Sequence, residues 1–275
     1  MRTEMNKCIN NLSAGVPRDD DEYLGPDGLI YCRRCGNPRE LIINAMGITK
    51  TVRCICPCQK AKRDAEASRS RRDAYDVERR KCFLNVNDEM RYWTFENDDG
   101  KTPTWSEPMM RYADNFADFK SKNKGLLLYG NVGTGKTYMA AAIANRVIDN
   151  GYRAKLRTFK GIEAEYFNAK NKVQFMDDLN RCDLLIFDDL GVERESGFMN
   201  ELVFNVINTR CVTGLPFICT TNLTGEELNS PDNIKNARIY DRILGQCYPF
   251  KMEGPSRRKQ RLKETITETQ MMLGL

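Results

Sequence analysis

The stretch GLLLYGNVGTGKT, residues 125–137, indicates the fold of this 275-residue chain more clearly than any other segment. Its first five residues are continuously apolar, as in a strand that is buried on both faces. Similar runs occur at LLIFD (184–188) and FICTT (217–221), and further strands are expected at 154–158 and 248–252. Helices are expected at 138–150 and 199–213, each followed by a glycine. This alternation predicts an α/β fold, a parallel sheet flanked by helices.

The second part of that stretch, GNVGTGKT, matches the phosphate-binding pattern G-x-x-x-x-G-K-[ST] between a predicted strand and a predicted helix. Its glycines let backbone N–H groups converge on phosphate oxygens at the positive end of a helix. We expect Lys136 to bridge the β- and γ-phosphates of ATP, and Thr137 to bind Mg²⁺. The predicted contacts to ATP or ADP are Gly130, Asn131, Val132, Gly133, Thr134, Gly135, Lys136, Thr137 and Tyr138.

Two acids end the second apolar run, at the edge of the sheet where ligands bind in open α/β folds. We expect Asp188 to hold Mg²⁺, directly or through water. Asp189 is the candidate for polarising the attacking water, because the chain has no histidine. Glu193 and Glu195 are alternatives for that role.

Residues 90–258 resemble the AAA+ ATPases of the bacterial and phage helicase-loader family, the DnaC/DnaI group, with IstB-like transposition ATPases as close kin. The resemblance rests on the segments GNVGTGKT, LLIFDDLGVERES, the strand ending TTN, NARIYDRIL and GPSRR. It implies an ATPase with Mg²⁺. Many AAA+ proteins have Glu where this chain has Asp189, so slow hydrolysis is expected.

The resemblance also implies roles for single residues. Asn222 is the sensor-1 residue, and Arg258 is the sensor-2 arginine. Arg242 is the arginine finger, which reaches the ATP site of a neighbouring subunit, and Arg238 is the next candidate. The alternative for these last two is that they line a helix face.

Two structural details follow from the same resemblance. The stretch that contains Trp93 and Phe95 is expected to lie over the adenine. Only some twenty residues follow the predicted last strand, too few for a full helical lid. The tail is therefore expected to form one helix or to stay partly disordered.

Eleven cysteines and no histidine are present, so any zinc site in this chain must rest on thiolates, with or without the help of a carboxylate. Cys32 and Cys35 form a C-x-x-C pair, and CICPC follows at 54–58. Two thiolate pairs at this separation predict a structural Cys₄ zinc site. Alternation along a strand does not select among Cys54, Cys56 and Cys58. Comparison with relatives that end in C-x-C-Gln favours Cys56 and Cys58, with Cys54 spare.

The predicted domains are a zinc-binding N-terminal domain with a basic helical linker (1–88) and an AAA+ ATPase domain (89–275). The charged run 59–81 reads as an exposed connector helix, and a nucleic-acid-binding arm is the alternative. The net charge of +5 is a weak indication of an anionic partner. No apolar run is long enough to span a membrane, and no signal peptide is evident. A cytoplasmic protein of a bacterium or a phage-infected bacterium is expected.

Aromatic residues and lysines follow the strand at 154–158. Tyr166, Phe167, Lys170 and Lys172 predict contacts with single-stranded DNA. The alternative is an ordinary amphipathic helix with Tyr166 and Phe167 in the core. The resemblance implies that the N-terminal domain grips a hexameric replicative helicase, and that the ATPase domain assembles into a hexamer or spiral. The expected function is ATP-dependent helicase loading, and the alternatives are an IstB-like transposition helper or an ATP-gated adaptor with little hydrolysis.

Overall fold

The computed structural model describes residues 17, 19–45, 47–100, 102–191, 197–230 and 234–274. The chain divides into two compact units, Met1–Asp73 and Ala74–Leu275. This division lies earlier in the chain than position 88, because Tyr75, Cys82 and Phe83 pack into the core of the second unit.

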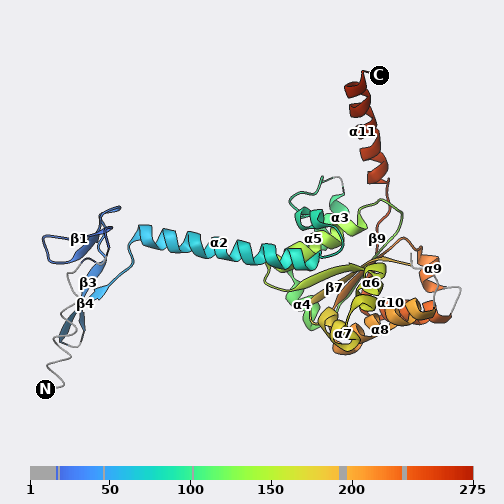
Figure 1. Ribbon diagram of the computed structural model, residues 1–275, viewed down its shortest axis with the longest axis horizontal. Helices are drawn as coiled ribbons and strands as arrows, with labels where there is room; N and C mark the ends of the chain where they lie inside the picture. Colours follow the sequence, from blue (N-terminus) through green and yellow to red (C-terminus); the bar gives the residue numbers. More distant parts are fainter. Residues whose placement is uncertain are drawn as a thin grey trace. The chain divides into compact units, whose positions relative to one another are not determined.

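The first unit contains two antiparallel hairpins (Figure 1). The first pairs β1 (Glu22–Leu24) with β2 (Ile30–Cys32), and the second pairs β3 (Glu40–Ala45) with β4 (Ile48–Arg53). The backbone of Arg39 joins them, because its N–H donates to Ile30 O at 2.7 Å and its carbonyl accepts from Cys54 N–H at 2.8 Å.

The predicted basic helix is present as α2 (Pro57–Cys82). Its side chains are exposed over most of its length, in keeping with a hydrophobic pattern that has no apolar stripe. The last turns belong to the second unit. There Arg79 forms an ion pair with Asp149, and Arg157 Nη1 donates to Cys82 O at 2.7 Å.

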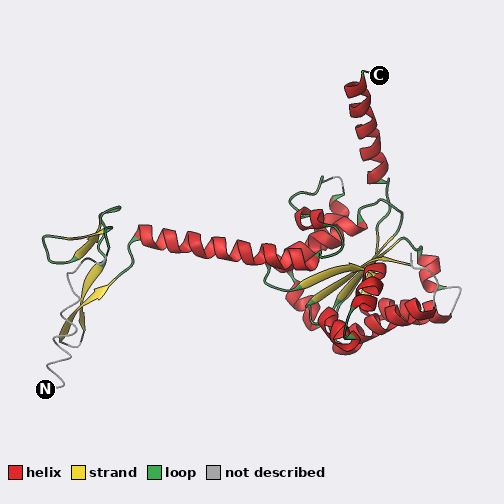
Figure 2. Ribbon diagram, in the orientation of Figure 1, coloured by secondary structure: helices red, strands yellow, loops and turns green. Residues whose placement is uncertain are grey.

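A five-stranded parallel sheet forms the centre of the second unit, in the order β6-β7-β8-β5-β9 (Figure 2). The strands are β5 (Gly125–Tyr129), β6 (Ala154–Thr158), β7 (Leu184–Leu190), β8 (Phe217–Thr221) and β9 (Cys247–Lys251). All five predicted strands are confirmed. The strand β7 continues two residues beyond the predicted end, and β9 begins one residue before its predicted start.

Helices cover both faces of this sheet (Figure 2). The helices of the second unit are η1 (Asp88–Tyr92), α3 (Pro103–Asp114), α4 (Phe116–Ser121), α5 (Lys136–Asp149), α6 (Phe159–Asn168), α7 (Lys172–Asn180), α8 (Gly197–Thr213), α9 (Gly225–Asn229), α10 (Ile234–Gln246) and α11 (Arg257–Leu273). Alternate strand residues face opposite layers. Leu126 and Ile186 therefore pack with α3 and α5, whereas Leu127 and Phe187 pack with α8 and α10.

After β9 and a short loop, the tail forms the helix α11, which was one of the two expected alternatives for it. Among the helices that the structure describes, none combines the length and the apolar character needed to cross a bilayer.

Candidate nucleotide-binding site and cysteine cluster

The phosphate-binding loop connects β5 to α5 and keeps its shape through glycines. Gly130 has φ +131° and Gly133 has φ +82°, a region that L side chains rarely adopt. A Cβ atom at Gly130 would lie 2.4 Å from Met252 O, and one at Gly133 would lie 2.2 Å from Ser256 Oγ. Side chains at these positions would therefore push the loop away from the segment after β9.

Lys136 begins α5 and turns back over the loop. Its Nζ donates to Gly130 O at 2.8 Å and to Asn131 O at 2.7 Å. Burial lowers the pKa of this amine, and the nearby carboxylates of Asp189 and Asp188 oppose that shift. The ammonium group thus donates to two neutral carbonyl oxygens of the loop. A phosphate anion at this position would accept stronger, charge-assisted hydrogen bonds from it.

Asp188 is the fifth residue of β7 and is 4% exposed. Its Oδ1 accepts from Thr137 Oγ1 at 2.9 Å and from Thr220 Oγ1 at 2.6 Å. Burial raises the pKa of this carboxyl, although both hydroxyl contacts lower it. A threonine hydroxyl beside a carboxylate is the oxygen donor set that Mg²⁺ prefers, so Thr137 and Asp188 fit the predicted metal site.

Asp189 adopts φ +60° at a register shift in the pairing of β7 with β8. Its N–H donates to Thr220 Oγ1 at 3.0 Å, and its side chain is exposed in the nucleotide cavity. Thr220 therefore positions both acids. Sequence periodicity carries no signal for this bulge. The alternatives Glu193 and Glu195 lie outside the described residues.

A cavity of about 500 Å³ opens beside the loop. It is lined by Tyr92, Trp93, Asn97, Asp98, Asp99, Val132, Gly133, Gly135, Lys136, Thr137, Tyr138, Asp189, Asn222, Arg257 and Arg258. The structure therefore places Asn222 and Arg258 in the same cavity lining as the phosphate loop. A neighbouring cavity of about 600 Å³ is lined by Gly130, Asn131 and, again, Asn222. Thr134 is buried, and its hydroxyl donates to Asn131 O at 3.0 Å.

Aromatic rings form one wall of the 500 Å³ cavity. Trp93 stacks on Tyr138 with ring centroids 5.6 Å apart, and Tyr138 Oη donates to Thr94 O at 2.8 Å. A flat base would fit against this wall. Phe95, which was expected there as well, packs against the hydrophobic core and does not line the cavity.

Arg257, which precedes the predicted sensor-2 arginine, also lines the cavity and was not predicted. Its guanidinium forms ion pairs with Asp98 at 3.3 Å and Asp99 at 3.4 Å, and its backbone N–H donates to Gly133 O at 2.9 Å. Two adjacent arginines in GPSRR and two adjacent acids in FENDD were the signal for it.

Arg238 and Arg242 lie on α10 at a distance from this cavity. Both guanidinium groups stack on the Phe204 ring of α8, at 4.6 Å and 5.1 Å from its centroid. Neither side chain lines the nucleotide cavity of its own chain. A contact with ATP would therefore require a second subunit.

The predicted DNA-contact residues divide between core and surface. Tyr166 packs against the core, in line with the alternative, and Lys172 Nζ lies 4.9 Å from the centroid of its ring. Phe167 is 60% exposed and stacks on Phe198 at 5.0 Å, and Lys170 is exposed. Exposed aromatic rings beside a lysine are one arrangement that stacks on nucleic-acid bases.

Four thiols meet in the first unit. The Sγ atoms of Cys32, Cys35, Cys56 and Cys58 all lie within 4.8 Å of one another. A tetrahedral zinc ion with Zn–S bonds of about 2.3 Å places its sulfurs about 3.8 Å apart, so the cluster fits this metal. Cys54 lies outside it and donates to Pro38 O at 3.3 Å. The backbone N–H and side chain of Asn37 lower the pKa of Cys35 to about 6, which favours a thiolate.

The chain is similar to several known proteins. The replicative helicase loader DnaI of Bacillus subtilis (strain 168) is 30% identical over 150 residues, which are 50% of this chain and 48% of that protein. The loader DnaC of Escherichia coli (strain K12) is 26% identical over 131 residues, 46% of this chain and 52% of that protein. A putative insertion sequence ATP-binding protein of Sinorhizobium fredii is 28% identical over 149 residues, 52% of this chain and 50% of that protein. The chain thus spans about half the length of the curated relatives it matches.

Solved structures agree on the fold. The crystal structure of DnaI has a TM-score of 0.54 at 26% identity, covering 65% of this chain and 99% of that one. The DnaC helicase loader has a TM-score of 0.53 at 20% identity, covering 61% and 100%. The family model described as IstB-like ATP binding protein matches residues 109–265, more than half of the chain. On this match, and with the phosphate loop and Asp188 in place, the chain belongs to the IstB-like ATP-binding protein family.

Proposed function

We propose that this protein hydrolyses ATP to place a replicative DNA helicase onto single-stranded DNA during DNA replication. The observation that carries the proposal is a nucleotide site with Lys136, Thr137 and Asp188 in one cleft, in a chain whose relatives include the replicative helicase loaders DnaI and DnaC. Such a protein would act in the bacterial cytoplasm, where the genome is replicated.

Each residue of the cleft has a chemical part in this proposal. Lys136 exchanges its two carbonyl acceptors for β- and γ-phosphate oxygens. Thr137 and Asp188 would hold Mg²⁺, which neutralises charge on the phosphates. Water attacks the γ-phosphorus, the bond to the bridging oxygen breaks, and ADP leaves with that electron pair. Asp189, exposed in the cavity, accepts the proton of the water, and Asn222 orients that water.

Arginines complete the charge balance on the phosphates. Arg258 lines the cavity and serves the γ-phosphate in its own subunit. Arg242 serves the site of a neighbouring subunit in an assembled hexamer or spiral, with Arg238 as the alternative. Their shared stacking on Phe204 keeps both guanidinium groups in place before assembly.

The two remaining parts bind macromolecules. In this proposal the thiols of Cys32, Cys35, Cys56 and Cys58 hold a structural zinc ion, and the first unit grips the helicase. Phe167 and Lys170 contact single-stranded DNA, with Phe198 extending the stacking surface.

The deciding experiment is a reconstitution with the full chain. Purified replicative helicase from the same cell is mixed with circular single-stranded DNA, ATP and the protein, and the helicase retained on the DNA is measured. Retention should rise with the protein and fall to background with Lys136→Ala. Asp189→Asn should keep nucleotide binding, read from Trp93 fluorescence with Trp105→Phe as background, and lose about 100-fold in turnover. Equal helicase retention with and without the protein would refute the loader proposal.

The second candidate is a transposition helper, and the match to an insertion sequence ATP-binding protein favours it. It predicts ATP-dependent binding to duplex DNA and stimulation of a transposase, with no effect on the helicase. A third candidate, an ATP-gated adaptor, predicts that turnover of the unaltered protein equals that of Lys136→Ala, with and without single-stranded DNA.

A further inference from the structure

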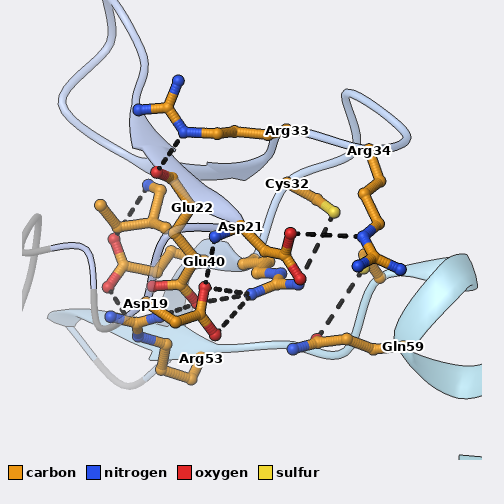
Figure 3. A network of polar contacts seen from close by, with 12 residues as sticks. Asp19, Asp21, Glu22, Cys32, Arg33, Arg34, Glu40, Arg53 and Gln59 are labelled. Atoms are coloured by element: carbon orange, nitrogen blue, oxygen red, sulfur yellow. Dashed lines mark hydrogen bonds and ion pairs between the residues drawn. The ribbon is translucent and has the colours of Figure 1, made fainter. Parts of the chain in front are cut away.

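A buried arginine touches the cysteine cluster. Arg39 lies between the two hairpins of the first unit and is 3% exposed. Its Nη2 donates to Cys32 Sγ at 3.6 Å. The side-chain amide of Gln59 faces the same guanidinium, and with its oxygen turned toward Arg39 it accepts from both Nη1 and Nη2 at 3.2 Å. Gln59 and Cys32 are both seen in this network (Figure 3).

The other side of the same guanidinium meets carboxylates. Its Nη1 donates to Glu22 Oε1 at 3.0 Å and to Asp19 Oδ1 at 3.4 Å. Glu22 is itself buried, so this ion pair is shielded from water. One planar group therefore links a β1 carboxylate to a sulfur of the cluster, which a single-point cation cannot do.

A second arginine provides a natural comparison. Arg53 Nη1 pairs with Glu22 Oε1 at 2.7 Å, and Arg53 Nε pairs with Glu40 Oε1 at 3.2 Å. Glu40 Oε2 in turn accepts from Ile30 N–H at 3.1 Å. Arg53 thus pairs with the carboxylates of the network, whereas Arg39 pairs with a carboxylate and also donates a hydrogen bond to the thiol.

Charge explains why this difference matters for a metal. Four thiolates and one divalent ion carry a net charge of −2, and burying that charge is costly without donors or cations around the sulfurs. Groups that hydrogen-bond to metal ligands typically change metal affinity by about 10–100-fold. Cys32 is itself fully buried, so water does not provide this donor.

We propose that Arg39 is a positioning residue of the cysteine site: it orients the Cys32 sulfur toward the metal and offsets part of the charge of the four thiolates. This inference rests on the zinc site of the proposed function. Arg39 also couples metal binding to the hairpins, since the same side chain anchors Glu22 of β1.

The test compares Arg39→Met with Arg53→Met in the full chain. Zinc affinity is measured by competition with a fluorescent chelator, and the sulfur-to-metal charge-transfer bands are recorded after Co²⁺ substitution. We expect about 10–100-fold weaker zinc binding and shifted Co²⁺ bands for Arg39→Met. Arg53→Met should stay within about threefold of the unaltered protein, and Arg39→Lys should fall between the two.

Arg39→Met leaves Glu22 with one cation fewer, so the comparison is repeated in a Glu22→Gln background, where that buried carboxylate is absent. Equal weakening by Arg39→Met and Arg53→Met would overturn the inference, because it would show a purely structural network. Unchanged zinc affinity and Co²⁺ bands in Arg39→Met would overturn it as well. If the unaltered protein binds no zinc, the zinc site of the proposed function fails first, and the two failures are thereby distinguished.

Discussion

The two compact units bury different kinds of side chain. Of the described residues up to Asp73, the buried apolar ones are Ile30, Cys32 and Cys56. The unit from Ala74 onward buries two extended clusters of aliphatic and aromatic residues, one on each face of its sheet. In place of such a core, the first unit buries the charged groups of Glu22, Arg39 and Glu40.

This difference decides what each unit needs in order to fold. A fully buried aliphatic or aromatic side chain contributes about 1.5–3 kcal/mol, so two clusters of them can offset the conformational entropy of the second unit. The three buried apolar side chains described in the first unit contribute far less. Buried ion pairs add specificity more than stability, because desolvation cancels much of their attraction. We therefore expect a metal cross-link through the thiols to stabilise the first unit.

Removing the metal should give the largest effect. Zinc bound by four thiolates contributes on the order of 10 kcal/mol to the folding of small modules. Cys32→Ser with Cys35→Ser, or a strong chelator, should abolish hydrogen-exchange protection in β1–β4 and leave β5–β9 protected. Exchange measured by mass spectrometry checks both units in one sample.

Cys54→Ser is the matched control, because Cys54 lies outside the cluster and contacts Pro38 O. It should leave the protection of the hairpins unchanged. Persistent protection of β1–β4 after complete metal removal would show that the polar network alone suffices, and the contrast between the units would then be wrong.

The same contrast explains what could be predicted from sequence. Strands that are buried on both faces have continuous apolar sequences, so β5, β7 and β8 could be identified. The phosphate loop could then be placed between β5 and α5. The first unit has no such periodicity. Its thiol spacing predicted a metal site, yet the choice between Cys54 and Cys56 came from the resemblance. The contact of Cys54 with Pro38 O is tertiary and invisible in spacing.

The orientation of Asp189 and the contacts of Arg257 in the nucleotide cleft could not be predicted either, because tertiary structure determines both. Asp189 faces the cavity because of a bulge in β7, and a bulge leaves no periodic trace. Arg257 reaches Asp98 and Asp99, which are about 160 residues away in sequence. Phe159, the first residue of α6, stacks on Phe187 in the core at 5.0 Å, and this tertiary contact leaves no trace in the local sequence.

A pair of isoleucine substitutions should give the second-largest effect on stability. Ile186 is fully buried in β7, so Ile186→Ala should destabilise the second unit by about 2–5 kcal/mol. Ile43 in β3 is 50% exposed, so Ile43→Ala should change the stability of the first unit by less than about 0.5 kcal/mol. Denaturant unfolding followed by hydrogen exchange assigns each change to its unit. Comparable losses in both units would mean that the hairpins have a hydrophobic core after all.

The smallest effect concerns Asp188, one of the charged groups that the second unit buries. Burial raises the pKa of Asp188, with the hydroxyls of Thr220 and Thr137 acting in the opposite direction. The native state therefore binds this proton more tightly than the unfolded chain, whose pKa is about 3.9. The resulting stabilisation is complete below that unfolded pKa and is lost as the pH rises through the folded pKa. At neutral pH the buried carboxylate destabilises the nucleotide-free protein.

Asp188→Asn should consequently raise the melting temperature of the second unit at pH 7 by a few degrees. A change of about 1 kcal/mol in the free energy of unfolding produces a shift of this size in a unit of this length. Its amide oxygen can still accept from Thr137 and Thr220. The gain should shrink as the pH falls toward the folded pKa, and Mg²⁺ with ATP should stabilise the unaltered protein but not the variant. Asp189→Asn, at an exposed position where asparagine tolerates φ +60°, should leave the melting temperature unchanged. A lower melting temperature for Asp188→Asn would mean that the two hydroxyl contacts outweigh burial, and that the carboxylate stabilises the fold as well as binding the metal.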